Sequence, residues 1–249
     1  MTSTVRREFE TYEVFRERAK EPALSRNEKC GFPDALRRGQ SERIYTDICC
    51  KLTVLGNPKV KMLDIGPGCS ELAQHIVDAT ARRNQFLTVV DSPEMLRLLP
   101  DRPHLSKIEG PFPACLDRTT LSLGPFDAIL AYSVAHHVFF EANLSAFVDA
   151  AAQLLAEQGR LLLGDIPNAT MRKRFMASEA GKAYHKIHYP HLPEPSVVFN
   201  TLSPGEIDDG VVLGLLARMR AAGFHAFVMP QAADLPMANR REDLLIVRP

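Results

Sequence analysis

The sequence lacks an excess of either charge, because 30 lysines and arginines balance 30 aspartates and glutamates among its 249 residues. Proteins that bind nucleic-acid phosphates usually carry a basic excess, so this balance argues against a nucleic-acid partner. The first 20 residues contain no apolar run of the kind found in signal peptides, and no later stretch is long and apolar enough to span a bilayer. We therefore expect neither a nucleic-acid partner nor a membrane partner.

Cysteine is sparse and shows no pairing pattern. The five cysteines are odd in number, and no two of them are spaced as C-x-x-C. Disulfide frameworks and zinc sites depend on paired cysteines, so neither is expected. The sequence instead predicts reduced thiols and a cytoplasmic protein.

What the sequence does contain is an alternation of strands and helices. Short apolar runs predict strands, and apolar residues at helical spacing predict the helices between them. The last two strands have no helix between them and should pair as an antiparallel hairpin. These elements indicate an α/β protein with a Rossmann-like, doubly wound, seven-stranded sheet that has one antiparallel strand. The strands are expected at 60–65, 86–90, 105–109, 126–132, 160–164, 224–229 and 243–247, and helices at 70–82, 143–157 and 205–222.

Two further segments are expected to flank the ligand. An N-terminal helical cap precedes the Rossmann-like domain, and Tyr12 and Phe15 in its first helix are expected to pack rather than to touch a ligand. A proline-rich insertion after the fifth strand is too long for a simple connection and is expected to be a lid. The cap is expected at 1–57, with helices at 3–20 and 41–55, and the domain at 58–249. The insertion is expected at 166–205, with a helix at 170–186. Residues 1–40 and 166–205 should together cover the pocket.

A glycine-rich turn follows the first strand of the domain, in the segment VKMLDIGPGCSEL. Gly66 and Gly68 let the backbone approach a ligand closely, and the helix after them presents free N–H groups. A nicotinamide dinucleotide fingerprint needs a third glycine, where this chain has Glu71. Asp64, inside the strand, suits a ligand with a cationic amino group. The turn therefore argues against an NAD-dependent enzyme.

Four motifs in order resemble those of class I S-adenosylmethionine-dependent methyltransferases. They are LDIGPG, LTVVDSPEML, GPFDAILAYSVAHHV and LLAEQGRLLLGDIPN, which span much of residues 58–165, and RREDLLIVRP fits the last strand. The chain is also similar to bacterial small-molecule methyltransferases found with surface-polysaccharide genes. The resemblance implies S-adenosyl-L-methionine as the cofactor and methyl transfer as the activity.

The resemblance also gives cofactor-binding roles to residues of these motifs. Asp91, at the end of the second strand, would hold both ribose hydroxyls. Many relatives have an aspartate after the third strand that contacts the adenine amino group, but this chain has Pro111 there. Adenine contact is therefore expected from Glu109, Phe112 or the backbone. The expected cofactor-binding residues are Asp64, Gly66, Pro67, Gly68, Asp91, Ser92, Met95, Glu109, Gly110, Phe112, Tyr132 and Ser133.

Candidate catalytic residues follow the fourth and fifth strands, whose carboxyl ends face the ligand in an open α/β sheet. His136 and His137 offer a base with a pKa near neutral for a hydroxyl acceptor, although either could instead pack against the next helix. Asp165 could accept a proton, orient a histidine, ligate a metal or cap a helix. Asp165 and Asn168 alone do not make a metal site, so no metal is expected.

These observations predict an enzyme that transfers a methyl group from S-adenosyl-L-methionine to a small polar acceptor. O-methylation of a sugar or sugar-nucleotide, in surface-polysaccharide or secondary metabolism, is the leading expectation. Two alternatives stay open: N-methylation of a small metabolite, and a cofactor-binding sensor or inactive partner subunit. The fourth strand lacks the [DN]-P-P-[YF] signature of enzymes that methylate base amino groups. The oligomeric state is left open.

Overall fold

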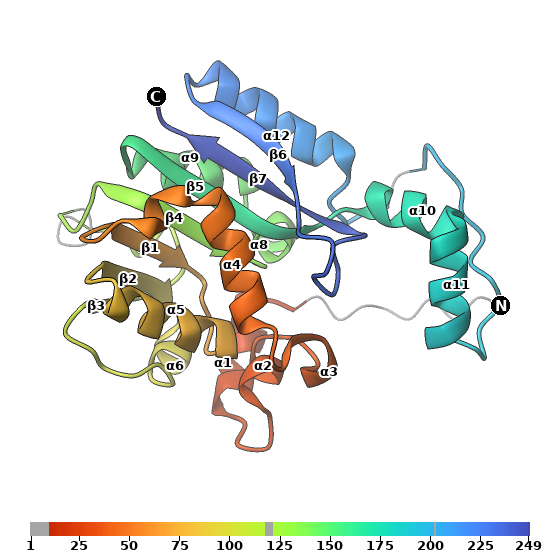
Figure 1. Ribbon diagram of the computed structural model, residues 1–249, viewed down its shortest axis with the longest axis horizontal. Helices are drawn as coiled ribbons and strands as arrows, with labels where there is room; N and C mark the ends of the chain where they lie inside the picture. Colours follow the sequence, from red (N-terminus) through yellow and green to blue (C-terminus); the bar gives the residue numbers. More distant parts are fainter. Residues whose placement is uncertain (1–9, 118–121, 202) are drawn as a thin grey trace.

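Seven strands form one sheet in the part of the chain that the structure describes. The computed structural model describes residues 10–117, 122–201 and 203–249. The strands are β1 (Lys61–Ile65), β2 (Phe86–Asp91), β3 (Leu105–Glu109), β4 (Phe126–Tyr132), β5 (Leu155–Pro167), β6 (His225–Pro230) and β7 (Arg241–Val247). Their order is β3-β2-β1-β4-β5-β7-β6 (Figure 1). Because β7 is antiparallel to β5 and β6 while the other neighbours are parallel, the predicted doubly wound sheet is confirmed.

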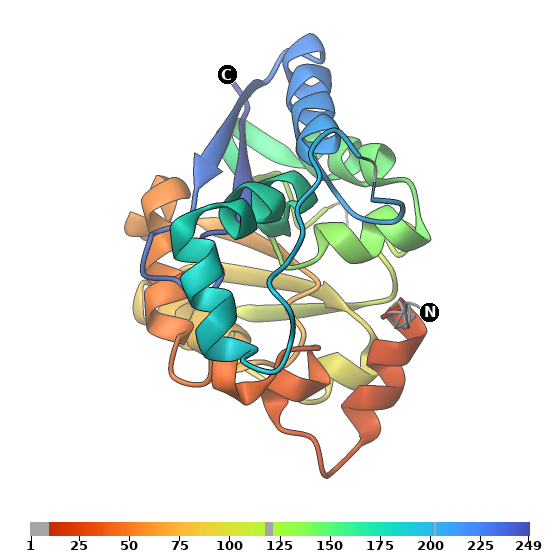
Figure 2. The same cartoon turned by 90° about the vertical axis from the view of Figure 1, so that its right-hand side faces the viewer.

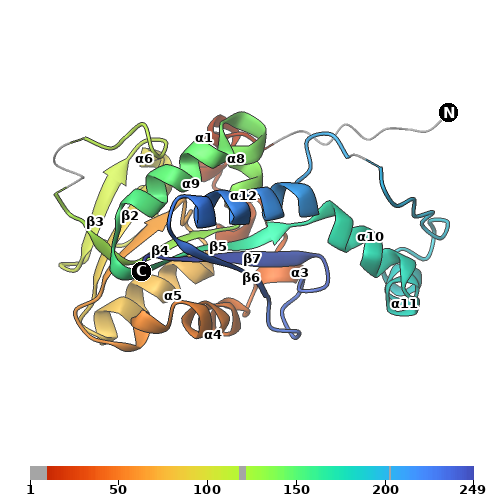
Figure 3. The same cartoon turned by 90° about the horizontal axis from the view of Figure 1, so that it is seen from above.

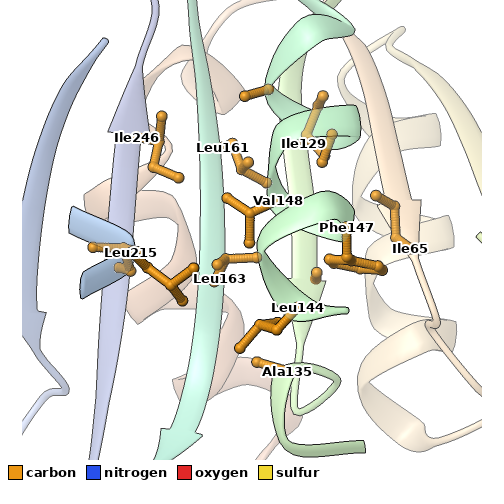
Figure 4. Packing of buried hydrophobic residues seen from close by; sticks show 14 of the residues in the cluster. Ile65, Ile129, Ala135, Leu144, Phe147, Val148, Leu161, Leu163, Leu215 and Ile246 are labelled. Atoms are coloured by element: carbon orange, nitrogen blue, oxygen red, sulfur yellow. The ribbon is translucent and has the colours of Figure 1, made fainter. Parts of the chain in front are cut away.

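Helices cover both faces of this sheet (Figure 3). Figure 4 shows Leu144 and Val148 packed against Leu161 and Leu163 of β5. These four side chains are nearly inaccessible to solvent, and burying each stabilises the fold by about 1.5–3 kcal/mol. The helices on this face are α8 (Ala135–Glu141), α9 (Leu144–Gln153) and α12 (Asp209–Ala221), and those on the other face are α4 (Ser41–Lys51) and α5 (Glu71–Arg82).

Local sequence signals determine where the helices after β1 and β2 begin. Ser70 caps α5 through its hydroxyl, and Ser92 caps α6 (Pro93–Leu96), which has a proline at its first position, where a missing N–H costs nothing. Gly66 and Gly68 both have positive φ, a conformation that costs little only for glycine. The loop between β1 and α5 is therefore a tight turn at the carboxyl ends of the strands.

The alanine-rich helix predicted over 143–157 is shorter than expected. It ends at Gln153, because Leu155 already pairs with Phe126 of β4. Sheet hydrogen bonds replace helical ones from that point, so Gly159 lies inside β5 and does not end a helix. Tertiary pairing overrides the helix propensity of this segment.

The N-terminal part of the cap consists of α1 (Tyr12–Lys20), α2 (Arg26–Lys29) and α3 (Asp34–Arg37), which lie together beside the strand ends (Figure 1). Residues 3–9 of the first predicted helix lie outside the described residues. The helix predicted over 41–55 is α4 followed by the 3-10 turn η1 (Thr53–Gly56).

The insertion after β5 forms an arm that projects beyond the sheet in Figure 1 and lies in front of the sheet in Figure 2. The helix predicted at 170–186 is split into α10 (Ala169–Ala177) and α11 (Glu179–His188), because Ser178 caps the second helix. Within the described ranges, no helix has the length and apolar character needed to cross a bilayer.

Candidate active site

A cavity of about 380 Å³ lies between the cap and the carboxyl ends of β1, β2 and β4. This volume is within the range of small-molecule sites. The glycine turn and the residues that follow β4 form one wall, and side chains of the cap form the other. None of the described residues between 166 and 205 lines it. Described residues of the segment 1–40 thus line the cavity, and those of the segment 166–205 do not.

Most of the predicted cofactor residues meet at this cavity. Ser92 and Glu109 are the exceptions, because the Ser92 side chain is occupied in capping α6 and Glu109 is exposed to solvent. Pro111, which stands where relatives have an adenine-binding aspartate, is also in the wall. The predicted residues that line the cavity are Asp64, Gly66, Pro67, Gly68, Asp91, Met95, Gly110, Phe112, Tyr132 and Ser133.

Asp64, which is buried, and Asp91, which is half-buried, both line the cavity with a carboxyl group. Burial, with a smaller contribution from Asp91, raises the pKa of Asp64 to about 8. A carboxyl group in this state gains its charge readily when a cationic group binds beside it. Asp64 is therefore suited to an ammonium group of a ligand.

The Asp91 carboxylate is oriented by the backbone around it. Its two oxygens accept the N–H groups of Gly68 at 2.8 Å and Ser92 at 2.6 Å. Burial raises its pKa to about 6, although these hydrogen bonds favour the charged form. Each carboxylate oxygen has a second lone pair, so Asp91 can still accept from ligand hydroxyls.

The cap contributes a cation, Arg37, to the opposite wall. Its guanidinium lies over the Phe32 ring, with the central carbon 4.0 Å from the ring centroid. It donates to Ser133 Oγ at 3.3 Å and pairs with Asp165, while its buried Nε has no hydrogen-bond partner among the described residues. A buried donor without a partner is costly, so a ligand acceptor at this point would be favourable.

Asp165 is enclosed by arginines and does not line the cavity. Besides Arg37, it accepts a hydrogen bond of 2.7 Å from Arg241, and Ser133 also donates to it. Burial alone raises its pKa, but Arg241 and Arg37 outweigh this and hold the pKa below the ordinary value. This geometry makes Asp165 a counter-ion that orients Arg37, a role that was not among those expected from the sequence.

The two adjacent histidines differ in position. His137 lines the cavity, and its Nδ1 lies 2.9 Å from the carbonyl oxygen of Glu10. A carbonyl oxygen only accepts, so this Nδ1 carries the proton and Nε2 is the basic nitrogen. Burial lowers the pKa of His137, which keeps the ring neutral. His136 does not line the cavity, and its buried Nδ1 has no hydrogen-bond partner among the described residues.

Tyr12 and Phe15 line the cavity, contrary to the expectation that they only pack. The Tyr12 hydroxyl is buried and has no hydrogen-bond partner among the described residues. Burial and the nearby Asp91 raise its pKa to about 12, so it remains a donor. Helical spacing placed these aromatic residues on one helix face but could not show that this face meets a cavity.

No protein-family model and no curated protein matches this sequence. Solved structures do match. The N-methyltransferase NodS from Bradyrhizobium japonicum WM9, in complex with S-adenosyl-L-homocysteine, superposes with a TM-score of 0.59 at 14% identity, covering 96% of this chain and 98% of NodS. The fold is that of class I methyltransferases.

Two further methyltransferase structures have the same fold. The plantazolicin methyltransferase BpumL, with a desmethyl analogue and S-adenosyl-L-homocysteine, gives a TM-score of 0.58 at 12% identity over 95% of this chain and 96% of its own. The CurJ carbon methyltransferase gives 0.53 at 13% identity, over 86% of this chain and 56% of its own. At such identities the likeness shows a shared fold. It does not carry the acceptors of these proteins over to this chain.

Proposed function

We propose that this protein transfers a methyl group from S-adenosyl-L-methionine to a small polar acceptor. The observation that carries the proposal is the set of charged side chains in one cavity. Asp64 is placed for the ammonium group of the cofactor, Asp91 for its ribose hydroxyls and Arg37 for its carboxylate. The unpartnered Nε of Arg37 and hydroxyl of Tyr12 fit a ligand rich in acceptor atoms.

NAD fits this set less well. It has no amino-acid moiety to match the pair formed by Asp64 and Arg37. Glu71, which replaces the third glycine of the dinucleotide fingerprint, accepts the backbone N–H of Gly39 at 2.9 Å and so holds the cap beside the turn. The structural neighbours that contain S-adenosyl-L-homocysteine support the same choice of cofactor.

An oxygen acceptor, in a sugar or sugar-nucleotide, is the leading proposal for the second substrate. The cofactor would supply a methyl group already activated on a sulfonium, so the protein has mainly to align and deprotonate the acceptor. His137 presents a neutral ring with a basic Nε2 to the cavity and would take the hydroxyl proton. Asp165 would hold Arg37 in position, and His136 would pack behind His137.

N-methylation of a small metabolite is the second candidate, since NodS is an N-methyltransferase with the same fold. Binding of the cofactor without transfer is the third. Incubation with methyl-labelled S-adenosyl-L-methionine and panels of sugars, sugar-nucleotides and amines distinguishes the three. Label in a hydroxyl-bearing acceptor supports the leading proposal, and label in amines only supports the second. Binding of cofactor without any labelled product supports the third.

A further inference from the structure

Cys30, in the wall of the cavity, lies against Cys69, so that two thiols are close together. Cys30 follows α2 in the cap, and Cys69 follows Gly68 in the glycine turn, 39 residues later. Their sulfur atoms are 4.0 Å apart, and the backbone N–H of Cys69 donates to Cys30 Sγ at 3.2 Å. This is the hydrogen-bond distance of a thiol pair and not a disulfide, whose sulfur atoms are about 2 Å apart.

The surroundings keep these thiols facing each other. Arg26 of α2 donates to the carbonyl oxygen of Cys69 at 3.2 Å and to that of Leu98 at 3.1 Å, which docks α2 on the turn. Cys30 Sγ lies so close to Gly68 that a Cβ there would be only 2.5 Å from the sulfur. The cap and the glycine turn are therefore in contact at the two sulfur atoms.

The two thiols differ in access. Cys69 is fully buried, whereas Cys30 is partly exposed and lines the cavity. A small oxidant that enters the cavity thus meets Cys30 first. The hydrogen bond between the two thiols lowers the pKa of Cys69 and, together with burial, raises the pKa of Cys30. Access to the cavity, and not acidity, therefore makes Cys30 the thiol that meets the oxidant and Cys69 the resolving thiol.

We propose that Cys30 and Cys69 form an oxidisable dithiol. It reduces hydroperoxides and is itself oxidised to a disulfide that links the cap to the glycine turn. Cys30 sulfur attacks one peroxide oxygen, the O–O bond breaks, and the leaving hydroxide takes the thiol proton as water. Cys69 sulfur then displaces hydroxide from the Cys30 sulfenic acid, which leaves as water with the Cys69 proton. Two thiols are oxidised, and one hydrogen peroxide is reduced to two waters.

The first test treats the full chain with hydrogen peroxide and digests it with trypsin without reduction. We expect a disulfide between the fragments 30–37 and 62–82, which disappears on treatment with a dithiol reductant. Cys50→Ser, which removes an exposed cysteine, should leave this product unchanged. Cys69→Ser should abolish it and leave Cys30 as a sulfenic acid that dimedone traps. Recovery of both fragments unlinked from oxidised wild-type protein would overturn the proposal.

A second test concerns access through the cavity and rests on the proposed function. S-adenosyl-L-homocysteine at 100 times its dissociation constant leaves about 1% of sites free, so it should slow alkylation of Cys30 by up to roughly 100-fold. Alkylation of Cys50 in the same sample should not change. If the ligand binds by calorimetry but does not protect Cys30, the proposed route of access is wrong. If the ligand does not bind, the cofactor assignment fails, while the peroxide test still decides the dithiol.

Discussion

At the scale of single residues, burial sets the charge of the groups that line the cavity. Burial keeps Asp64 largely uncharged and His137 neutral, and the Nε of Arg37 has no hydrogen-bond partner in the part of the chain that the structure describes. The glycine turn and the carboxylates Asp64 and Asp91 could be predicted from sequence, because they stand at fixed offsets from strands. Arg37 could not, because nothing in its local sequence indicates that α3 brings it to Ser133.

The raised pKa of Asp64 predicts that cofactor affinity depends on pH. Below about pH 8 the free protein holds the Asp64 proton, and a bound ammonium group favours its release. Affinity for S-adenosyl-L-homocysteine should therefore rise with pH between 6 and 8, by up to about tenfold per pH unit. Calorimetry in two buffers of different ionisation enthalpy measures the released proton. Asp64→Asn should bind more weakly and without this release, and an unchanged slope would exclude Asp64 as the titrating group.

His137 and His136 should differ in their effect on turnover. His137→Gln should lower kcat by about 100- to 10,000-fold if His137 is the base, because it lines the cavity. His136→Gln, one position away and outside the lining, serves as the matched control and should retain more activity. Since burial lowers the pKa of His137, the acid limb of kcat/KM for wild type should lie below pH 6.5. Equal kcat in wild type and His137→Gln would show that His137 is not the catalytic base.

At the scale of elements, strands were easier to predict than short helices. Each central strand is covered by helices on both faces of the sheet, so it is a continuous apolar run that can be recognised from sequence alone. α2 and α3 have four residues each, too few to show helical periodicity, and α8 was also missed. The arm was predicted as an insertion, but its direction depends on tertiary contacts that sequence spacing does not contain.

The cap and the arm should therefore respond differently to substitution. Phe15→Ala removes a ring from the cavity wall that also packs edge-on against His137, with centroids 4.7 Å apart. Affinity for S-adenosyl-L-homocysteine should fall by about tenfold, the order expected for one aromatic contact. Ile187→Ala in the arm, where the side chain is exposed, should leave affinity unchanged. A loss with Ile187→Ala as large as that with Phe15→Ala would show that the arm does close on the ligand.

At the scale of the whole molecule, buried ion pairs join the cap to the far side of the sheet. Asp165 of β5 bonds Arg37 of α3 and Arg241 of β7, and Lys51 of α4 bonds Asp243 of β7 at 2.6 Å. The seven-stranded sheet with one antiparallel strand could be predicted from the alternation of its elements, but these long-range pairs could not, because their partners are up to 192 residues apart.

Breaking the Asp165 pair should destabilise the fold. Asp165→Asn leaves the buried Arg37 and the half-buried Arg241 without their counter-ion and should cost about 3–5 kcal/mol in the free energy of unfolding. Asp149→Asn, which breaks a partly exposed pair with Arg218, is the control and should cost less than about 1 kcal/mol. Because folding lowers the Asp165 pKa, this stabilisation is present above the unfolded pKa, about 3.9, and is lost as pH falls through the folded pKa. Urea unfolding at pH 7 measures the free energy of unfolding of both variants. An equal loss in the two would show that the Asp165 pairs stabilise the fold no more than an exposed ion pair does.

The central claim, that this cavity takes S-adenosyl-L-methionine, is tested most directly by thermal unfolding with S-adenosyl-L-homocysteine and with NAD. Ligand at 100 times its dissociation constant stabilises a protein by about 2.7 kcal/mol, and each kcal/mol raises Tm by roughly 2–4 °C in a chain of this size. We expect Tm to rise by several degrees with S-adenosyl-L-homocysteine and to stay constant with NAD. A rise with NAD alone, or with neither ligand at millimolar concentration, would contradict the account.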